Sequence, residues 1–372
     1  MGLIVLVAGC SKGVEDPVAP GGNETEQGLK AIAFSAGLPE QQEITRSTPL
    51  EEELPVGQKT FKVWGFKNDA YDSGTSSYTS YQTVFPGYFV NWVANTAATT
   101  ASNTHDWEYV GVSNSSVAQT IKYWDWSAKA YRYFAVTNYV ETKPATLVAG
   151  KIYNESFGTD EYQFTMLADV TDIAAAPFFS RMWFSTGNAV TYPDKQFGDP
   201  VVLEFTKPFA RVRIIFIFSE DGVNRTNIAQ MSFKPVSGAK IPQSGTVTVH
   251  YPLTGVKTSE YYSLADGYSG LDEFTRDWYE CSDPNDPNYA NREYWYTVLP
   301  SGDQGAYEMT IKIFGEFKTA FVPADFMQWK AGYEYTYLFK VTDAGGVTLD
   351  VIQVGINDWV IKNANNHTVY NW

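Results

Sequence analysis

The cysteine at position 10 is the residue with the most definite chemistry in this chain. It follows the apolar and small residues Leu6-Val7-Ala8-Gly9, and a polar stretch rich in glycine and proline begins directly after it. The small residues would let a peptidase reach the backbone, and the thiol could then accept a diacylglycerol. The pattern predicts a lipoprotein signal, with residues 1–10 as a signal-peptide remnant and Cys10 as the lipidation site. The alternative is an ordinary thiol in an apolar tail.

The short apolar run before this cysteine bears on how the chain meets a membrane. Residues 3–7 are far fewer than the roughly 20 that a membrane-spanning helix needs. No Lys or Arg precedes the run, so we expect the natural start to lie further upstream. Two or three acyl chains on Cys10 would anchor stably where one would be marginal. We therefore expect contact with a membrane only through the lipid.

The histidines offer little for catalysis or metal binding. His105, His250 and His367 are each isolated, without a cysteine or a second histidine at ligand spacing, so no zinc site is expected. A Ser-His-Asp arrangement assembles in space and stays open from sequence, but no serine lies in a Gly-x-Ser-x-Gly turn. Acidic neighbours disfavour a reactive thiolate at Cys281. We expect a protein that is not an enzyme and needs no metal or cofactor.

Two groups of aromatic side chains are the remaining candidates for a binding site. The first is Tyr123, Trp124, Trp126, Tyr131, Tyr133 and Phe134, and the second is Tyr289, Tyr294, Trp295 and Tyr296. Exposed aromatic rings could stack on sugars. Strand alternation more simply places about half of each group in a core, where large rings bury much area.

The composition is that of a β-rich protein with a substantial core. Hydrophobic residues make up 44% and aromatic residues 16% of the 372 residues, and no long stretch has the apolar period of a helix. This length allows two domains of ordinary size. The net charge of −15 excludes nucleic acid and anionic membrane surfaces as expected partners.

The segments after Cys10 predict the elements that position these residues. Residues 11–28 have few apolar side chains and several Gly, Pro and acidic residues, which is typical of a linker. Residues 29–36 alternate weakly and predict a strand with Ile32, Phe34 and Ala36 on one face. A polar loop with Arg46 follows this strand.

Most of the remaining chain predicts short strands, among them one at residues 120–126. Apolar segments separated by Gly, Ser, Asn and Asp clusters favour antiparallel β-sandwiches with long loops and little helix. A second unit opens at residue 201 and includes the strongly β-prone segment 209–218. We place a boundary near residue 197, within a turn-rich segment, which gives an N-terminal domain of residues 29–197 and a C-terminal domain of residues 198–372.

Several motifs carry a resemblance to a known family. They are Ile121-Lys122-Tyr123-Trp124, Tyr131-Arg132-Tyr133-Phe134-Ala135-Val136, Thr45-Arg46 before residues 61–66, Arg181-Met182-Trp183-Phe184-Ser185, Val298-Leu299-Pro300, Trp329-Lys330-Ala331-Gly332-Tyr333-Glu334-Tyr335 and Asp358-Trp359. In type and order they resemble fimbrillin-like lipoproteins, the type V pilus subunits of Gram-negative gut and oral bacteria. The resemblance spans Cys10 to Trp359. It departs from the family at Asp125, where proline is common, and in the insertion 265–292.

The resemblance implies a fold and a maturation route. The fold would be two tandem transthyretin-like antiparallel β-sandwiches. The chain would be exported as a lipoprotein and cut by a trypsin-like or Arg-specific protease between Arg46 and Ser47. Loss of the strand that carries Ile32, Phe34 and Ala36 would expose an apolar groove with unpaired backbone groups, which is a template for a strand from another chain.

The resemblance also implies partners and a location. Other pilin subunits, identical or different, would polymerise with this chain by donor-strand exchange. The C-terminal tail, with Val369 or Tyr370 as an anchor, could supply the donor strand, or it could be a frayed end. The protein would lie in the outer membrane and at the cell surface, as part of a fimbrium. Adhesion to a host or bacterial receptor would be a further role.

A different class of function stays open beside the pilin hypothesis. The chain could be a monomeric surface lipoprotein that binds glycans through exposed aromatic side chains. This alternative predicts that Trp124 or Trp295 lies at the surface beside polar groups. The pilin hypothesis predicts that residues 29–36 form a strand of the first sandwich.

Overall fold

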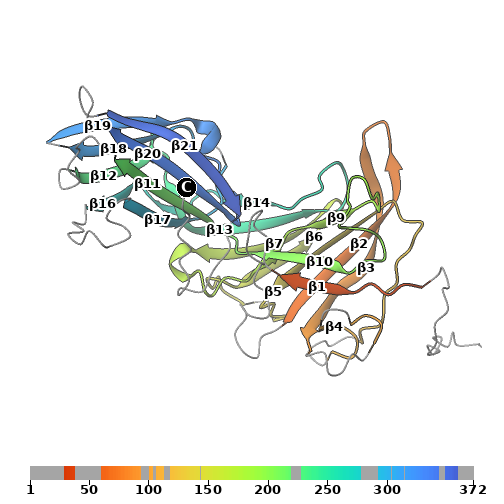
Figure 1. The fold of residues 1–372 in the computed structure, drawn as a ribbon. Helices are drawn as coiled ribbons and strands as arrows, with labels where there is room; N and C mark the ends of the chain where they lie inside the picture. The colour runs from red at the N-terminus through yellow and green to blue at the C-terminus, as the bar shows by residue number, and fades with distance from the viewer. Residues whose placement is uncertain are drawn as a thin grey trace, which may run out of the picture.

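The computed structural model describes a molecule built of strands (Figure 1). It describes residues 29–37, 60–93, 100–103, 106–112, 118–142, 144–218, 228–277, 292–302, 304–313, 315–342 and 348–358. Within these ranges the only helical elements are the 3₁₀ turns η2 (Val170–Asp172) and η4 (Ala324–Phe326). No helix in the described ranges is both long and apolar enough to cross a membrane.

The first sheet runs through the N-terminal lobe. Its order is β1-β10-β8-β5-β2-β3-β4, with β9 paired to β5. The strands are β1 (Phe34–Gly37), β2 (Thr60–Asp72), β3 (Ser77–Trp92), β4 (Trp107–Glu108), β5 (Ala130–Thr137), β8 (Phe179–Ser180), β9 (Trp183–Ser185) and β10 (Val201–Thr206). Every residue of β5 is buried, which indicates that the centre of this sheet is covered on both faces.

A second sheet covers one of those faces. Its order is β14-β13-β7-β6, with β15 paired to β13. The strands are β6 (Ile152–Phe157), β7 (Glu161–Asp169), β13 (Ile241–Pro252), β14 (Tyr261–Leu264) and β15 (Ser269–Leu271). Alternation in β7 and β13 sends every second side chain inward. Phe134 of the first sheet stacks on Tyr251 of the second with ring centroids 4.1 Å apart, so the two sheets share a core.

The buried Arg132 joins these two sheets by hydrogen bonds. Its Nε donates to Asn68 Oδ1 at 3.1 Å, and its Nη1 donates to the carbonyl oxygens of Pro252 and Lys257 at 3.3 and 2.7 Å. The guanidinium also lies 4.6 Å from the ring centroid of Phe184. Burial lowers the pKa of Arg132 to about 10, and the hydrogen bonds offset part of the cost of desolvation.

The C-terminal lobe is a sandwich of two four-stranded sheets. One sheet is β17 (Arg292–Val298), β11 (Ala210–Phe218), β20 (Tyr333–Thr342) and β21 (Thr348–Asp358), in that spatial order. The other is β16 (Phe274–Asp277), β12 (Ile228–Pro235), β18 (Tyr307–Ile313) and β19 (Glu316–Val322). Val212, Phe233, Tyr337 and Met309 lie in the single apolar core between them.

The all-β prediction is confirmed, and two details differ from it. Pairing is not wholly antiparallel, because β1 with β10 and β11 with β20 are parallel. Residues 120–126 form no strand, since Tyr123 makes only an isolated bridge to Ala31. The described part of the insertion 265–292 contains β15 and β16.

The predicted boundary near residue 197 and the transthyretin-like arrangement stay predictions. The pairing adds one fact that bears on the boundary: β10, β13, β14 and β15 follow it in sequence but complete the two N-terminal sheets. The chain therefore returns to the N-terminal lobe after its first visit to the C-terminal lobe at β11.

Candidate functional site

The N-terminal segment 29–37 lies along the edge of the first sheet. In Figure 1, β1 (red) runs beside β10 (light green). The two strands pair in parallel, with Phe34 opposite Val201 and Gly37 opposite Glu204. The backbone N–H of Val201 donates to the carbonyl of Ala33 at 2.8 Å. β1 is thus the terminal strand of the sheet, as far as the described residues extend.

The opposite side of this segment meets a different part of the chain. Ala31 bridges Tyr123, the N–H of Ile32 donates to the carbonyl of Lys122 at 2.7 Å, and the N–H of Trp124 donates to the carbonyl of Lys30 at 3.0 Å. The first half of segment 29–37 therefore pairs with residues 122–124, and its second half pairs with β10 on the other side. Residues 122–124, predicted as a strand from sequence, lie along the side of the segment opposite β10. We call the space that segment 29–37 occupies between these residues and β10 the slot.

Three consecutive residues of the segment are buried, because Ala33 between Ile32 and Phe34 is covered as well. Ile32 and Phe34 have no exposed surface, whereas Ala36 is half-buried. The ring of Phe34 meets Phe85, Tyr133, Tyr109 and Phe61 in edge-to-face contacts, with centroids 5.1, 5.8, 6.0 and 6.5 Å away. Full burial of such a side chain contributes roughly 1.5–3 kcal/mol.

One side chain of the slot binds the backbone of the segment. The Tyr109 hydroxyl donates to the carbonyl of Ile32 at 2.9 Å and accepts from the N–H of Lys122 at 3.1 Å. Burial raises the pKa of this hydroxyl well above its ordinary value of 10.0. Tyr109 therefore stays a neutral donor and links the segment to residues 122–124.

The other predicted site residues cannot be placed. Cys10, Arg46, Ser47, Val369 and Tyr370 lie outside the described residues. Arg46 is nevertheless in the interval 38–59 that joins β1 to β2. A cut after it would leave segment 29–37 attached to the rest of the molecule only by noncovalent contacts.

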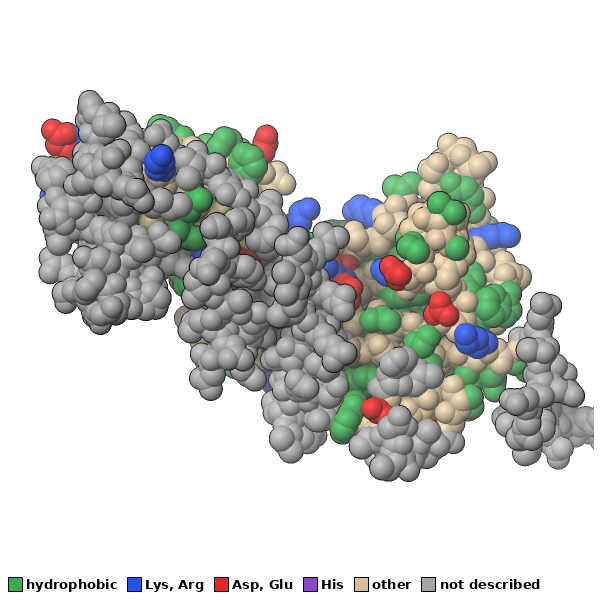
Figure 2. Space-filling view, in the orientation of Figure 1, with side chains coloured by type: hydrophobic (Ala, Val, Ile, Leu, Met, Phe, Trp, Pro, Cys, Tyr) green, Lys and Arg blue, Asp and Glu red, His purple; other side chains and the backbone are tan. Residues whose placement is uncertain are grey.

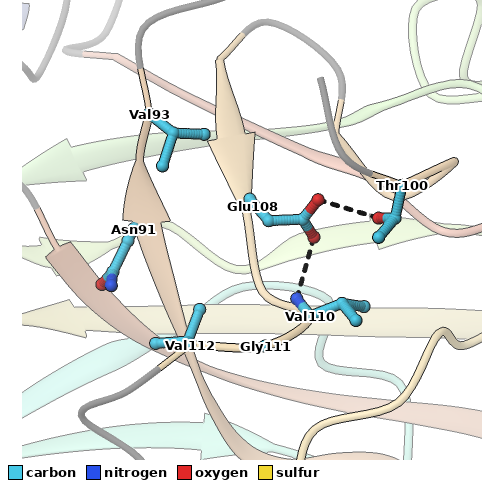
Figure 3. Close-up of a pocket in the computed structure, with 7 residues that line it drawn as sticks. All are labelled: Asn91, Val93, Thr100, Glu108, Val110, Gly111 and Val112. Atoms are coloured by element: carbon cyan, nitrogen blue, oxygen red, sulfur yellow. Dashed lines mark hydrogen bonds between the residues drawn. The ribbon is translucent and has the colours of Figure 1, made fainter. Parts of the chain in front are cut away.

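A cavity of about 490 Å³ lies where β3 and β4 meet. Asn91, Val93, Thr100, Glu108, Val110, Gly111 and Val112 line it (Figure 3). The buried Glu108 carboxylate accepts from Ser102 Oγ at 2.6 Å, Thr100 Oγ1 at 2.8 Å, and the N–H groups of Tyr109 and Val110, both at 2.8 Å. Four hydrogen bonds therefore stabilise the Glu108 carboxylate. They also fix the turn at residues 108–110, which places Tyr109 beside segment 29–37.

One arrangement on the second sheet resembles a nucleophile with its base. His250 Nε2 lies 2.7 Å from Ser263 Oγ, and His250 Nδ1 lies 3.2 Å from Glu161 Oε2. Tyr261 stacks on the imidazole with centroids 4.4 Å apart. Burial lowers the pKa of His250, although Glu161 opposes this. Sequence reasoning missed this group because its members come from three different strands.

The central strand β13 leaves no spare backbone donors beside His250. His250 lies in β13, which pairs with β7 on one side and β14 on the other. Ladder pairing uses the N–H groups of a central strand, whereas an oxyanion needs two unused donors about 3 Å away. We therefore interpret Ser263, His250 and Glu161 as a hydrogen-bonded row of side chains on the surface of the sheet.

The aromatic groups divide between core and surface. Trp124, Tyr131, Tyr133 and Phe134 are buried, so the first group is mainly core. Trp126 and Trp295 are 54% and 37% exposed. The Arg211 guanidinium carbon lies 3.6 Å from the ring centroid of Trp295, which requires a face-on contact, and that of Arg213 lies 4.7 Å away.

The visible surface of the N-terminal lobe carries charges of both signs. In Figure 2, Lys and Arg are interspersed with Asp and Glu, with apolar side chains between them. Four exposed apolar residues lie on or beside the slot: Leu29, Tyr123, Trp126 and Val202. This surface has no single-signed patch on the described face that Figure 2 shows.

Comparisons with known proteins gave only distant structural similarity. No family model and no curated protein matches the chain. A candidate cell adhesion protein of Bacteroides ovatus is 11% identical, with 90% of this chain and 99% of that chain covered and a TM-score of 0.39. The fimbrial anchor protein Mfa2 of Porphyromonas gingivalis is 10% identical, with 90% and 99% covered and a TM-score of 0.27.

A third solved structure is the C-terminally truncated tip fimbrial protein Mfa3 of Porphyromonas gingivalis. It is 10% identical, with 81% of this chain and 94% of that chain covered and a TM-score of 0.31. TM-scores this low do not establish a common fold, so the likeness leaves the function of this chain to its own residues.

Proposed function

We propose that this chain is a structural fimbrial subunit that polymerises by donor-strand exchange after proteolysis at Arg46. One observation carries the proposal. Segment 29–37 buries Ile32 and Phe34 completely, yet it lies at a sheet edge and connects to β2 through the interval that contains Arg46. A core-filling strand at the edge is one that a partner strand can replace.

Proteolysis supplies the reason for replacement. In the intact chain the covalent link keeps segment 29–37 at a high effective concentration beside its slot. A cut after Arg46 removes that link. Departure of the segment then leaves the N–H groups of Val201 and Trp124 and the carbonyl of Lys122 unpaired. Unpaired groups at a sheet edge accept a strand from another chain.

The order of the segments couples assembly to export. Cys10 is the proposed lipidation site and precedes the segment that would leave. The same cut would therefore release the mature protein from its lipid anchor and open the slot. The expected partners are a maturation protease and other pilin subunits, identical or different, with Val369 or Tyr370 of the tail as a possible donor anchor. The proposed location is the outer membrane and then the fimbrium, where adhesion to a surface receptor is a further role.

Limited proteolysis tests this proposal. Trypsin should release residues up to Arg46 from the full chain while the remainder stays folded, and mass spectrometry identifies the cut. The cut protein should then form a ladder of multimers on unboiled gels. Arg46→Gln is the control, because a chain that is not cut at this position should retain the segment and remain a monomer. A cut remainder that loses the segment but stays monomeric would count against donor-strand exchange.

The exposed Trp295 favours a second candidate function, which is binding of a neutral sugar. A pyranose has an apolar C–H face that stacks on an aromatic ring, and its hydroxyls need donors and acceptors nearby. Trp295 keeps part of its surface in solvent while Arg211 holds it face-on, and Glu334 lies within 3.8 and 4.0 Å of the two arginines.

Ligand-observed NMR with methyl β-galactopyranoside tests this candidate. Saturation transfer to the C–H protons of the sugar is expected for the unmodified chain and should be lost in Trp295→Ala. Trp126→Ala is the matched control, because it removes another exposed indole. Equal transfer in all three proteins, or no transfer in any, would eliminate the Trp295 site.

A further inference from the structure

The slot around Phe34 is a box of four aromatic rings. Phe61 comes from β2, Phe85 from β3, Tyr133 from β5, and Tyr109 from the turn after β4. All four are buried and belong to one apolar cluster. Because the rings come from separate elements of a packed core, the shape of the box is fixed by the fold and not by Phe34 alone.

A glycine at the floor of the box keeps the rings in place. A Cβ on Gly65 would lie 2.6 Å from Tyr133 Cε1 and 2.9 Å from Phe85 Cδ2. Contacts this short are not tolerated, so only glycine at this position of β2 allows the two rings to approach Phe34 as they do. The box is therefore built for an aromatic side chain in a defined position.

The neighbouring positions have different requirements. Ile32 is fully buried, Ala36 is half-buried, and Ser35 between them pairs with the exposed Val202. The backbone direction is also set, because β1 runs parallel to β10. Within the segment, the Tyr109 hydroxyl hydrogen-bonds to the backbone carbonyl of residue 32, which any amino acid provides.

We infer that the slot selects its partner strand by sequence: an aliphatic residue, then an aromatic residue two positions later, then a small residue after two more, on a strand parallel to β10. This inference rests on the proposed strand exchange and names the chemistry of the incoming strand. Backbone pairing alone would accept any extended chain. The aromatic box adds selectivity, because a strand without the ring leaves a cavity lined by four rings.

Register makes the selection stricter. Side chains alternate between faces, so moving the aromatic residue by one position sends it away from the box. An exchange of Ala33 and Phe34 therefore keeps composition, length and net charge but removes the fit. Such a peptide distinguishes selection by the aromatic box from nonspecific hydrophobic binding.

The test uses the cut full-length protein and synthetic peptides in trans. The probes are the 29–37 peptide (LKAIAFSAG), its Phe34→Ala form, and the form with Ala33 and Phe34 exchanged, each with a fluorescent label. Fluorescence anisotropy gives the three dissociation constants. We expect both altered peptides to bind on the order of a hundredfold more weakly than the native peptide, as the cost of emptying an aromatic core site implies.

The outcomes distinguish the inference from the proposed function. If the native peptide does not bind and the cut protein does not assemble, strand exchange itself is wrong. If the native peptide binds and both altered peptides bind within threefold of it, exchange stands and selection by the box is overturned. A Tyr109→Phe protein checks the geometry, since it should weaken all three peptides by a similar factor.

Discussion

At the scale of single residues, Phe34 is the side chain of its segment that fills the aromatic box. It has no exposed surface and touches rings from four different elements. Its neighbour Ser35 faces the other way, toward the exposed Val202. The contrast between these two adjacent residues allows a direct measurement of what the slot contributes to stability.

Phe34→Ala should lower the free energy of unfolding by about 3–5 kcal/mol in the uncut protein, since it empties a packed aromatic site. Urea denaturation followed by circular dichroism measures the change. Ser35→Ala, in the same strand, should change stability by no more than about 0.5 kcal/mol. Equal effects of the two substitutions would show that the segment is not seated as described.

Glu260 gives a pH-dependent prediction. Its carboxylate accepts from the N–H of Met182 at 2.7 Å, and burial raises its pKa above 4.5 despite this hydrogen bond. A carboxyl group whose folded pKa is raised favours folding while it is protonated, and that contribution is lost as the pH rises through the folded pKa. Glu260→Gln keeps an acceptor for Met182 and removes the ionisation.

We therefore expect Glu260→Gln to raise the melting temperature at pH 8 and to leave it nearly unchanged at pH 4. Differential scanning calorimetry at the two pH values makes the comparison. The same gain at both pH values would mean that titration of this carboxyl is not the cause.

At the scale of elements, the buried Arg132 gives a test of how the two N-terminal sheets are joined. Arg132→Met keeps most of the apolar stem and leaves Asn68 and two backbone carbonyls without their donor. The expected loss is about 3 kcal/mol in urea denaturation. The solvent-accessible pair of Lys234 and Glu308, 3.1 Å apart, is the control, and Lys234→Met should cost less than about 1 kcal/mol.

The strand ladder also predicts that Ser263 is not a nucleophile. Its hydrogen bond to His250 has suitable length, but the central strand β13 pairs on both sides. We expect no labelling of Ser263 by a fluorophosphonate probe at neutral pH, with trypsin as the positive control. Labelling that disappears in Ser263→Ala would contradict this and would reopen the question of enzymatic activity.

Elements with strong local patterns were predictable, and those that depend on distant partners were not. β2, β5, β11 and β20 contain long apolar or alternating runs, which predict strands without further information. β8, β9 and β15 have two or three residues each, so no period can be read. The parallel partner of β1 lies more than 160 residues away, and nothing in the local sequence specifies it.

The site was predicted in part for the same reason. The strand period predicts that Ile32 and Phe34 point inward, and both are fully buried, but it does not predict the burial of Ala33 between them. Sequence reasoning missed three features: the pairing with residues 122–124, the hydrogen bond from the Tyr109 hydroxyl, and the hydrogen bonds of Glu108 that fix the turn before it. Each depends on a loop that folds back onto the segment, and a loop has no period that sequence could reveal.

At the scale of the whole molecule, we propose that the N-terminal segment is a removable part of an otherwise continuous structure. The other strands of the first sheet are joined through β2, β5 and β3, and the chain then passes through β10 to the C-terminal sandwich. Loss of segment 29–37 takes away one edge strand and leaves that path intact. We therefore expect the cut chain to lose the segment and remain folded, as polymerisation by strand exchange requires.

A reversible covalent lock on this segment would show whether its release is what permits polymerisation. Ser35 and Val202 are paired opposite each other on neighbouring strands, which lie roughly 4.8 Å apart, within the range that a disulfide spans. The lock is Ser35→Cys with Val202→Cys in a chain whose own Cys10 and Cys281 are replaced by serine.

The measurement is the mass distribution of the trypsin-cut, locked protein by size-exclusion chromatography with light scattering, before and after a reductant is added. We expect a monomer that retains segment 29–37 while the disulfide is intact, and multimers that have lost it after reduction. Multimers of equal size and amount in both states, with the segment still bound, would contradict it.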